Sequence, residues 1–511
     1  MTGGGLIVLV AYGAQNILLS GTPQMTYFYK AFRRYSHFST ENVTTAMDGP
    51  NELFFDQTIK VRAKIQRIGD LLSDMYFTFQ LPDIYSKYVT PTPQRTSQFQ
   101  FQWVRYIGAA LINNAAFFVG GQKIQEFDGT YLMAKAVADY DADTFEKWRV
   151  LVGDTNELSD PAKGLYAGGT NSSGYPSVYP SSLPNRPSIF GQEVHVPLPF
   201  WFSDTSTQAL PLVGLQLHDC EVQITLNPIE QLYTYLDASG FRVAPNFRMN
   251  SVIDDIRMNN PQYGTTTDLS GQIKNFLTDF GTKAPALNTW FFYPRIQSTY
   301  VYLPKEEQTL FATQQLSYLI YQTSMYPTSG LYNRQILDLE THNPITRLLF
   351  ITQRSDAASR NDFSNFTNWW NYPHPPYLPT PGQTPINISG FSSGLLIPQG
   401  QLNTLRSLRV LCDGNEIQEE KQIDYFTKIT PFRCISGSAK SLIPIYSFSL
   451  HSPSAQPSGS INASRIRNFQ VEVDVYPLPV NTNYTYDLRI YVENINFFEV
   501  ASGMGGLKYA L

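Results

Sequence analysis

The side chains most suited to chemistry are the six histidines of a 511-residue chain. A metal site would place them at short spacings such as HxxxH or HxH with a carboxylate nearby, and neither spacing occurs. One pair, His218 and Asp219, stands just before an expected strand and has the residue types of a catalytic pair. A histidine satisfied at a strand edge is the simpler interpretation. The sequence therefore predicts no enzyme, no metal site and no cofactor.

Cysteines and glycines point to no catalytic chemistry either. Cys220, Cys412 and Cys434 show no CxxC spacing, which favours buried, reduced thiols over a disulfide framework or a structural zinc site. The glycine clusters Gly3–Gly5 and Gly503–Gly506 lack the lysine and the βαβ context of a phosphate-binding loop. We interpret them as places where the backbone turns or approaches its surroundings closely.

The charge balance argues against a protein that coats nucleic acid. The formal net charge is -5 and the pI is near 5.8, whereas such coats depend on basic surfaces that release counterions. A short cluster of Arg33, Arg34, Tyr35 and Phe38 has the residue types that bind single strands. On an acidic chain, a protein interface or a contact within the chain is the better interpretation. No direct nucleic-acid partner is expected.

Asparagine sequons are the remaining candidate sites. Asn171, Asn365 and Asn387 each begin an Asn-x-Ser/Thr pattern and lie in two long tracts rich in Pro, Gly, Ser and Asn, at 164–187 and 355–400. If the chain carries N-linked sugars, these are the favoured positions. A chain made in the cytosol does not meet the lumenal machinery, and a composition rich in Asn, Ser and Thr produces the pattern by chance.

The elements that must position these residues are mostly strands. A length of 511 residues predicts two or more domains, while 14% aromatic and only 15% charged residues suit β-structure with large interfaces. Residues 58–66 alternate apolar and polar side chains, as a half-buried strand does, and 75–80 predict a second strand. Helices are expected over 139–152, capped by Asp143 or Thr144, and over 304–311, with Pro304 at the first helical position.

A repeat along the chain predicts a duplicated β-domain. The hairpin at 117–126 has a twin at 410–419, in which a turn glycine again precedes Ile-Gln-Glu. Three further pairs follow the same order, and they are 75–79 with 347–351, 196–202 with 443–448, and 221–226 with 470–475. Many short strands with few helices are typical of jelly rolls. We place the junction within 227–245, around a short helical segment.

The N-terminus carries an apolar run, Leu6, Ile7, Val8, Leu9 and Val10, bounded by glycines. It is far shorter than the roughly 20 residues that cross a bilayer, and no secretory signal accompanies it, so a reducing cytosol is expected for synthesis. We expect an extended docking arm whose apolar side chains are covered by a partner.

The motifs together resemble those of the major capsid proteins of nucleocytoplasmic large DNA viruses. The resemblance rests on GGGLIVLVAYGAQ at the start, VGGQKIQEFDG, LETHNPITRLLF, the block YSFSLHSPSAQPSGSINASR and the terminal SGMGGL. It implies two consecutive eight-stranded antiparallel jelly rolls with few short helices. The division expected is a docking arm at 1–30, a first jelly roll at 31–232 and a second at 233–511.

The resemblance also implies a function and partners. The chain would be a structural protein that forms homotrimers, and these pseudo-hexameric capsomers would tile an icosahedral shell assembled in the host cytoplasm. Neighbouring capsomers, minor capsid proteins and inner membrane proteins would be its partners. Two alternatives remain open, namely a minor capsid or scaffold protein of the same fold, and a glycan-binding, lectin-like β-sandwich. The second is suggested by the aromatic segment at 368–372.

Overall fold

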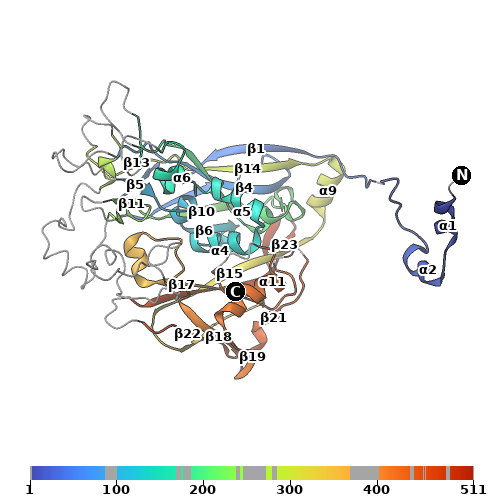
Figure 1. Ribbon diagram of the computed structural model, residues 1–511. Helices are drawn as coiled ribbons and strands as arrows, with labels where there is room; N and C mark the ends of the chain where they lie inside the picture. The colour runs from blue at the N-terminus through green and yellow to red at the C-terminus, as the bar shows by residue number, and fades with distance from the viewer. Residues whose placement is uncertain are drawn as a thin grey trace. The chain divides into compact units, whose positions relative to one another are not determined.

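The computed structural model describes residues 3–30, 32–86, 100–167, 174–176, 186–236, 242–245, 272–278, 285–368, 402–437, 442–452, 454, 456–478 and 484–509 (Figure 1). The chain separates into two compact units, Met1–Ser39 and Thr40–Leu511. None of the described helices is both long enough and apolar enough to span a bilayer.

The first unit contains two short helices, α1 at Gly4–Val10 and α2 at Ala14–Ser20. The expectation of an extended arm is therefore wrong. A segment without a neighbouring strand must satisfy its own backbone groups, and here the amide of Ala11 donates to the carbonyl oxygen of Ile7 at 2.9 Å. Every described residue of both helices is exposed. The unit extends to Ser39 rather than to residue 30.

The second unit holds two β-sandwiches of the same topology. In the first, the sheet β1-β14-β4-β8 faces the sheet β3-β10-β6-β7. In the second, β15-β23-β17-β20 faces β16-β22-β18-β19. Their bounds are β1 Ser39–Ala46, β3 Ile59–Lys64, β4 Leu71–Gln80, β6 Ile112–Val119, β7 Gln122–Phe127, β8 Glu193–Pro197, β10 Cys220–Leu226, β14 Arg295–Tyr302, β15 Leu316–Leu331, β16 Gln335–Asp338, β17 Pro344–Arg354, β18 Leu405–Cys412, β19 Asn415–Gln422, β20 Ile445–Ser447, β22 Phe469–Val475 and β23 Tyr486–Ala501.

This arrangement confirms the predicted jelly rolls and their duplication. Each of the four predicted pairs occupies the same place in its roll, because β4 corresponds to β17, the β6–β7 hairpin to the β18–β19 hairpin, β8 to β20, and β10 to β22. Both hairpin turns use positive φ, at Gly120 and Gly121 in one roll and at Asp413 and Gly414 in the other. The predicted alternation of buried and exposed side chains is also confirmed, because β3 buries every second residue beginning with Ile59.

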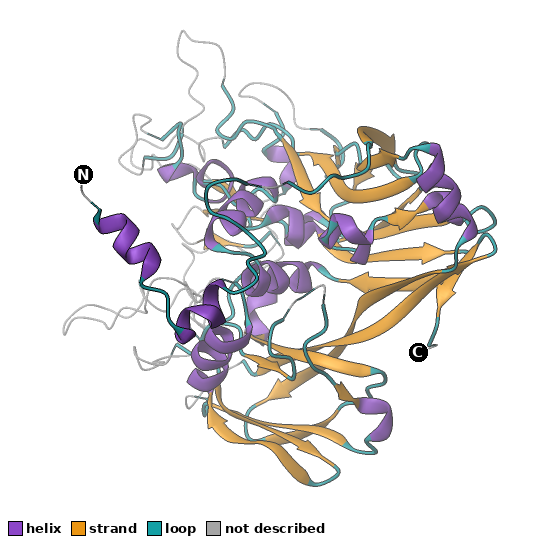
Figure 2. Ribbon diagram, turned by 90° about the vertical axis from the view of Figure 1, so that its right-hand side faces the viewer, coloured by secondary structure: helices purple, strands orange, loops and turns teal. Residues whose placement is uncertain are grey.

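Short strands complete the sheets, and Figure 2 shows the strands of the two rolls one above the other. Within the described residues, β9 joins β4, β21 joins β17 and β24 joins β23, while β5, β11, β12, β2 and β13 form two small sheets of their own. Their bounds are β2 Glu52–Leu53, β5 Phe101–Trp103, β9 Leu210–Pro211, β11 Tyr233–Leu236, β12 Arg242–Val243, β13 Trp290–Phe291, β21 Ile461–Asn462 and β24 Met504–Leu507.

The boundary between the rolls differs from the predicted division at 232 and 233. Strand β14 pairs with β4 of the first roll along most of its length, so this roll extends to Tyr302. The segment at 229–236, expected to be helical, becomes one short turn followed by β11, which pairs with β5. The partner of β14 lies more than two hundred residues earlier in the chain, and the partner of β11 lies 130 residues earlier, with Tyr233 opposite Trp103. No local pattern encodes such distant partners.

Helices fill the connection after β7 and the junction between the rolls. The helix expected over 139–152 is confirmed as α5, although its cap is Asp141 rather than Asp143 or Thr144. A further helix, α4, which was not predicted, precedes it and is capped by Asp128. The proline-led helix is confirmed as α9, with Pro304 as its cap. The helical segments of this unit are α3 Ile107–Leu111, α4 Gly129–Asp139, α5 Ala142–Leu151, α6 Asn156–Ser159, η1 Pro161–Lys163, α7 Trp201–Asp204, η2 Ser206–Gln208, η3 Leu212–Gly214, η4 Ile229–Gln231, η6 Ile273–Asn275, α9 Lys305–Thr313, η7 Ser355–Arg360, η8 Tyr425–Ile429, α11 Thr430–Cys434 and η9 Ala463–Arg465.

Candidate functional site

The surface that joins the two rolls is the most elaborate site in the described chain. Helix α4 of the first roll lies against the sheet β15-β23-β17-β20 of the second, and Figure 1 draws it between β6 and β15. The ring centroids of Tyr131 and Tyr491 lie 5.5 Å apart. The ring centroid of Trp201 lies 5.1 Å from that of Tyr318 and 5.3 Å from that of Phe498. One hydrophobic core therefore runs from the first roll into the second.

A network of charges lies inside this junction. Arg347 is fully buried on β17, and its guanidinium donates to both oxygens of Glu493, at 2.6 and 2.7 Å. It also donates from Nη2 to Oδ2 of Asp139 on α4 at 2.9 Å. Lys135 lies 3.3 Å from both Asp139 and Asp204. The positive side chains thus hold carboxylates from both rolls together.

The network keeps its charges despite burial. Burial by itself raises the pKa of the Asp139 carboxyl, but the charges of Arg347 and Lys135 outweigh it and hold that pKa below its ordinary value. The same pairing holds the pKa of Arg347 well above its ordinary value although burial lowers it. Breaking such a network leaves an uncompensated buried charge, so the network fixes how the rolls meet.

A second polar cluster caps α4. The hydroxyl of Tyr491 donates to both oxygens of Asp128, at 2.9 and 2.7 Å, and Asp128 accepts from the amide of Tyr131 at 2.8 Å. Arg489 of the second roll donates to the hydroxyl of Thr130 at 2.7 Å. The start of α4 and its end are therefore both tied to the second roll.

The C-terminal motifs are structural. In the block at 446–465, the Ser464 hydroxyl accepts from the amide of Asn343 at 3.0 Å, and the amide of Ala463 donates to the Asn343 carbonyl oxygen at 3.2 Å. In the terminal SGMGGL, Ser502 and Gly503 form the turn after β23, and the remaining residues form β24, which pairs with β23. A Cβ on Gly505 would lie 2.6 Å from Cδ2 of Leu215, so this glycine allows the last strand to approach the first roll closely.

The predicted His218–Asp219 pair is not assembled into a catalytic arrangement. His218 Nδ1 lies 3.0 Å from the carbonyl oxygen of Gly505, whereas Asp219 pairs with Lys64 at 2.8 Å. The satisfied-histidine interpretation is therefore supported. Within the described ranges, no three or more His, Cys, Asp or Glu side chains gather in a way that could hold a metal ion.

The cysteines are free in the structure. Cys220 and Cys412 are buried, and burial raises the pKa of their thiols to about 12 and about 11. Cys434 is partly exposed. The predicted burial is thus confirmed for Cys220 and Cys412, whereas Cys434 is less buried than predicted.

Of the three favoured asparagines, only Asn365 belongs to the described residues. It is 5% exposed, its amide nitrogen donates to Asp362 at 2.8 Å, and its amide oxygen accepts from the Thr367 hydroxyl at 2.7 Å. A sugar at Asn365 would require these bonds to break, so the structure argues against that site. Asn171, Asn387 and the aromatic segment at 369–372 lie outside the described residues.

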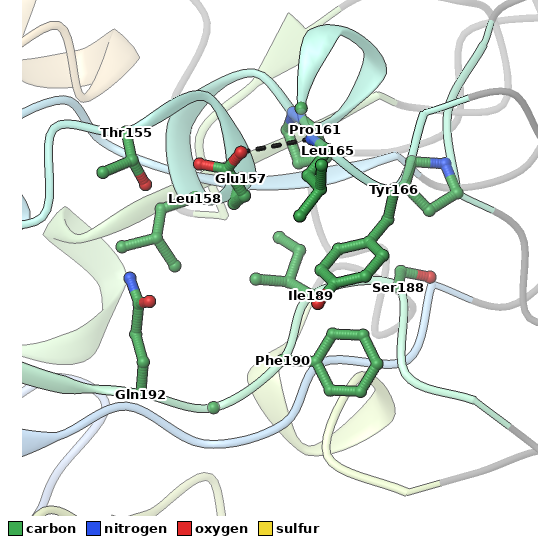
Figure 3. Close-up of a pocket in the computed structure, with 13 residues that line it drawn as sticks. Thr155, Glu157, Leu158, Pro161, Leu165, Tyr166, Ser188, Ile189, Phe190 and Gln192 are labelled. Carbon is green, nitrogen blue, oxygen red and sulfur yellow. Dashed lines mark hydrogen bonds between the residues drawn. The ribbon is translucent and has the colours of Figure 1, made fainter.

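A small surface pocket lies at the base of the first long tract. Its cavity is about 270 Å³ and is lined by Leu165, Tyr166 and Phe190 (Figure 3). The two rings lie 4.9 Å apart beneath the guanidinium of Arg186. Glu157 already accepts from the amide of Leu165 at 3.1 Å, as the dashed line shows. The pocket therefore holds the start of the tract in place, and its groups suggest no chemistry.

The predicted docking residues Leu6 to Val10 are 69–80% exposed. A second exposed apolar surface, absent from the sequence-based expectations, lies on η8 and α11, where Phe432 is 89% exposed. The sequence gives only a weak indication of this surface, because Phe432 lies in a stretch whose pattern of apolar residues did not predict a helix. Large exposed apolar side chains of this kind mark contacts with other proteins.

Comparison with known proteins agrees with a fold of two jelly rolls. A family model for the N-terminus of major capsid proteins matches residues 26–260, and a model for the large eukaryotic DNA virus major capsid protein matches residues 307–506. The chain is 24% identical to the major capsid protein of Phaeocystis pouchetii virus over 538 residues, and 24% identical to that of Paramecium bursaria Chlorella virus 1 over 532 residues, with 99% of both chains covered in each case.

A solved structure shows the same fold. The capsid of PBCV-1, a quasi-atomic model, superposes with a TM-score of 0.65 at 20% identity, covering 95% of this chain and 100% of that one. The two matched family regions together cover most of both rolls, and strand β14 lies between them.

Proposed function

Because this chain belongs to the family of major capsid proteins of nucleocytoplasmic large DNA viruses, and is a structural component of the virion shell, we propose that it acts as a homotrimer without enzymatic activity. Three copies supply six similar sandwiches, which form a pseudo-hexameric capsomer. Such capsomers contact one another across the shell.

One observation carries the proposal, namely that two rolls of one topology are joined through a fully buried interface. A rigid pair of like domains presents nearly the same surfaces twice around an axis. Closed rings arise when a repeated head-to-tail contact returns on itself. Three chains, each with two rolls, would form a closed ring of six rolls in this way.

Light scattering coupled to size-exclusion chromatography tests the proposal. We expect the purified chain to show about three times its 57.8 kDa mass at micromolar concentration. Obligate contacts of this kind bury more than about 2,000 Å², so free monomers should be scarce. A stable monomer that refolds reversibly by itself would count against the trimer.

The N-terminal unit supplies the proposed contact with other shell components. Leu6 to Val10 expose five apolar side chains on α1, and their burial at about 25 cal/mol per Å² is worth several kcal/mol. Minor capsid proteins or proteins of an inner membrane beneath the shell are the proposed partners. Assembly in the host cytoplasm accords with the free thiols.

A further inference from the structure

Within one chain, the helix that follows strand β7 packs on the neighbouring sheet. Helix α4 buries nine of its eleven residues, and the sheet face beneath it is equally covered. On that face Arg347, Leu349, Tyr491 and Glu493 are at most 3% exposed. This contact joins the connection after β7 of one roll to the outer face of the sheet β15-β23-β17-β20 of the next.

The second roll has a helical segment at the equivalent place, and the described residues cover less of it. Segments η8 and α11 follow β19 as α4 follows β7, and they run on as one helical stretch. Only four of their residues are buried. Ile429 is 49% exposed and Phe432 is 89% exposed. Arg433 is also exposed, and no ion pair with it is found among the described residues.

The first roll has an equivalent sheet face, which the described residues cover only in part. In both rolls a one-residue bulge interrupts the pairing, skipping Ser73 between β4 and β14 and Thr346 between β17 and β23. Aligning the two bulges places Asp74 at the position of Arg347. Asp74 and its outward neighbours Tyr76, Gln297 and Thr299 are only partly buried.

Asp74 has the features of a residue that awaits a cation. Its Oδ1 atom is buried, and among the described residues no hydrogen-bond partner reaches it. A buried carboxylate oxygen without a donor is costly and is rare in folded proteins. The intrachain contact has an aspartate at the end of the helix and an arginine on the sheet, at Asp139 and Arg347. The exposed helical segment of the second roll instead has an arginine near its end, Arg433, and the sheet of the first roll has an aspartate, Asp74.

We propose that η8 and α11 of one copy dock on the outer face of the sheet β1-β14-β4-β8 of a second copy, with Arg433 paired to Asp74 and with Ile429 and Phe432 buried beside them. The contact repeats the junction between the rolls with its charges reversed. Because it is head-to-tail, successive copies form a ring where the rotation between them closes, and the proposed trimer is such a ring. The reversed charge also prevents either helix from docking on the wrong sheet, since like charges would then meet. This inference rests on the proposed trimer and identifies the surface that forms it.

Charge exchange tests the pairing in the full-length chain. Arg433→Glu and Asp74→Arg are made singly and together, and sedimentation velocity measures association over a range of concentrations. Each single variant should raise the concentration needed for half association by about 100-fold or more, because one charge would remain buried without its partner. The double variant should recover association. Phe432→Ser should weaken it as well.

Controls separate docking from folding and from the trimer itself. Lys163→Glu changes a charge that belongs to neither surface and should associate as the unaltered chain does. Arg433 and Phe432 are exposed within one copy, so their variants should keep the circular dichroism and melting of the folded monomer. If Asp74→Arg does not fold, the association of Arg433→Glu is compared with that of Lys163→Glu, and this comparison tests the docking surface.

Two failures have different meanings. If the unaltered chain is not a trimer, the proposed function is wrong in that respect. If it is a trimer and Arg433→Glu associates as tightly as Lys163→Glu, the trimer stands and this docking surface is refuted. A double exchange that associates no better than either single variant would refute the Arg433–Asp74 pair.

Discussion

Replacing Arg347 by methionine should loosen the junction between the rolls more than any surface change. The side chain is 0% exposed, and its two carboxylate partners, Asp139 and Glu493, are 4% and 3% exposed. Methionine fills a similar volume but leaves two negative charges buried beside Lys135 alone. Removing one member of a buried ion network costs about 3–5 kcal/mol. The loss should appear as a lower urea midpoint of unfolding, followed by tryptophan fluorescence at one fixed protein concentration.

The defect should depend on pH in a defined direction. In the unaltered chain the pKa of Asp139 is held below its ordinary value, so its contribution to stability is present above the ordinary pKa and is lost only as pH falls through the lowered one. Without Arg347, burial raises the pKa of the same carboxyl, and the variant loses stability as pH rises above the ordinary value. The difference between the two proteins should therefore be largest near neutral pH and shrink on acidification.

A matched control keeps this reasoning refutable. Lys64 pairs with Asp219 at 2.8 Å, but both side chains are more than 60% exposed, so Lys64→Met should leave the midpoint unchanged. Combining Arg347→Met with Asp139→Asn and Glu493→Gln should restore much of the lost stability, since no orphan charge would remain. If Arg347→Met behaved like Lys64→Met, or if its defect grew in acid, the network would not hold the rolls together as we describe.

Three further predictions follow from the exposed and buried parts of the chain. Deleting Thr2 to Gln15 should leave trimers of normal size and melting temperature but prevent shell assembly, seen by electron microscopy; a variant that fails to fold or to form trimers would make this segment part of the roll. Removing Gly168 to Ser182 should leave the trimer intact by light scattering, because a tract rich in Pro, Gly, Ser and Asn cannot continue a strand ladder and is typical of a loop that tolerates change; loss of the trimer would make this tract part of the interface. An aromatic disulfide reagent at pH 8 should titrate Cys434 alone in the folded protein, since burial raises the thiol pKa of Cys220 and Cys412 to about 12 and about 11. Rapid reaction of all three thiols without denaturant would contradict the buried environment.

Local patterns predicted individual strands and their repetition correctly. Alternation along Ile59 to Lys64 and the paired glycines at 120 and 121 were sufficient, because side-chain period and turn geometry depend on neighbours in the chain. Local patterns did not predict helix α4. Its faces are apolar almost all round, since it is buried between two rolls, and such a helix shows little of the amphipathic period that marks a surface helix.

The amino-acid sequence by itself therefore determined the fold class, the duplication and the family, through short-range periodicity and motifs that recur in order. Only the tertiary structure decided which sheet β14 completes, where the first roll ends, and that Arg347, Asp139 and Glu493 meet in one buried network. The latter two carboxylates lie 208 and 146 residues from Arg347 along the chain. Pairing over such separations depends on how whole sheets stack, and burial turns three ordinary charged residues into the junction that fixes the two rolls against each other.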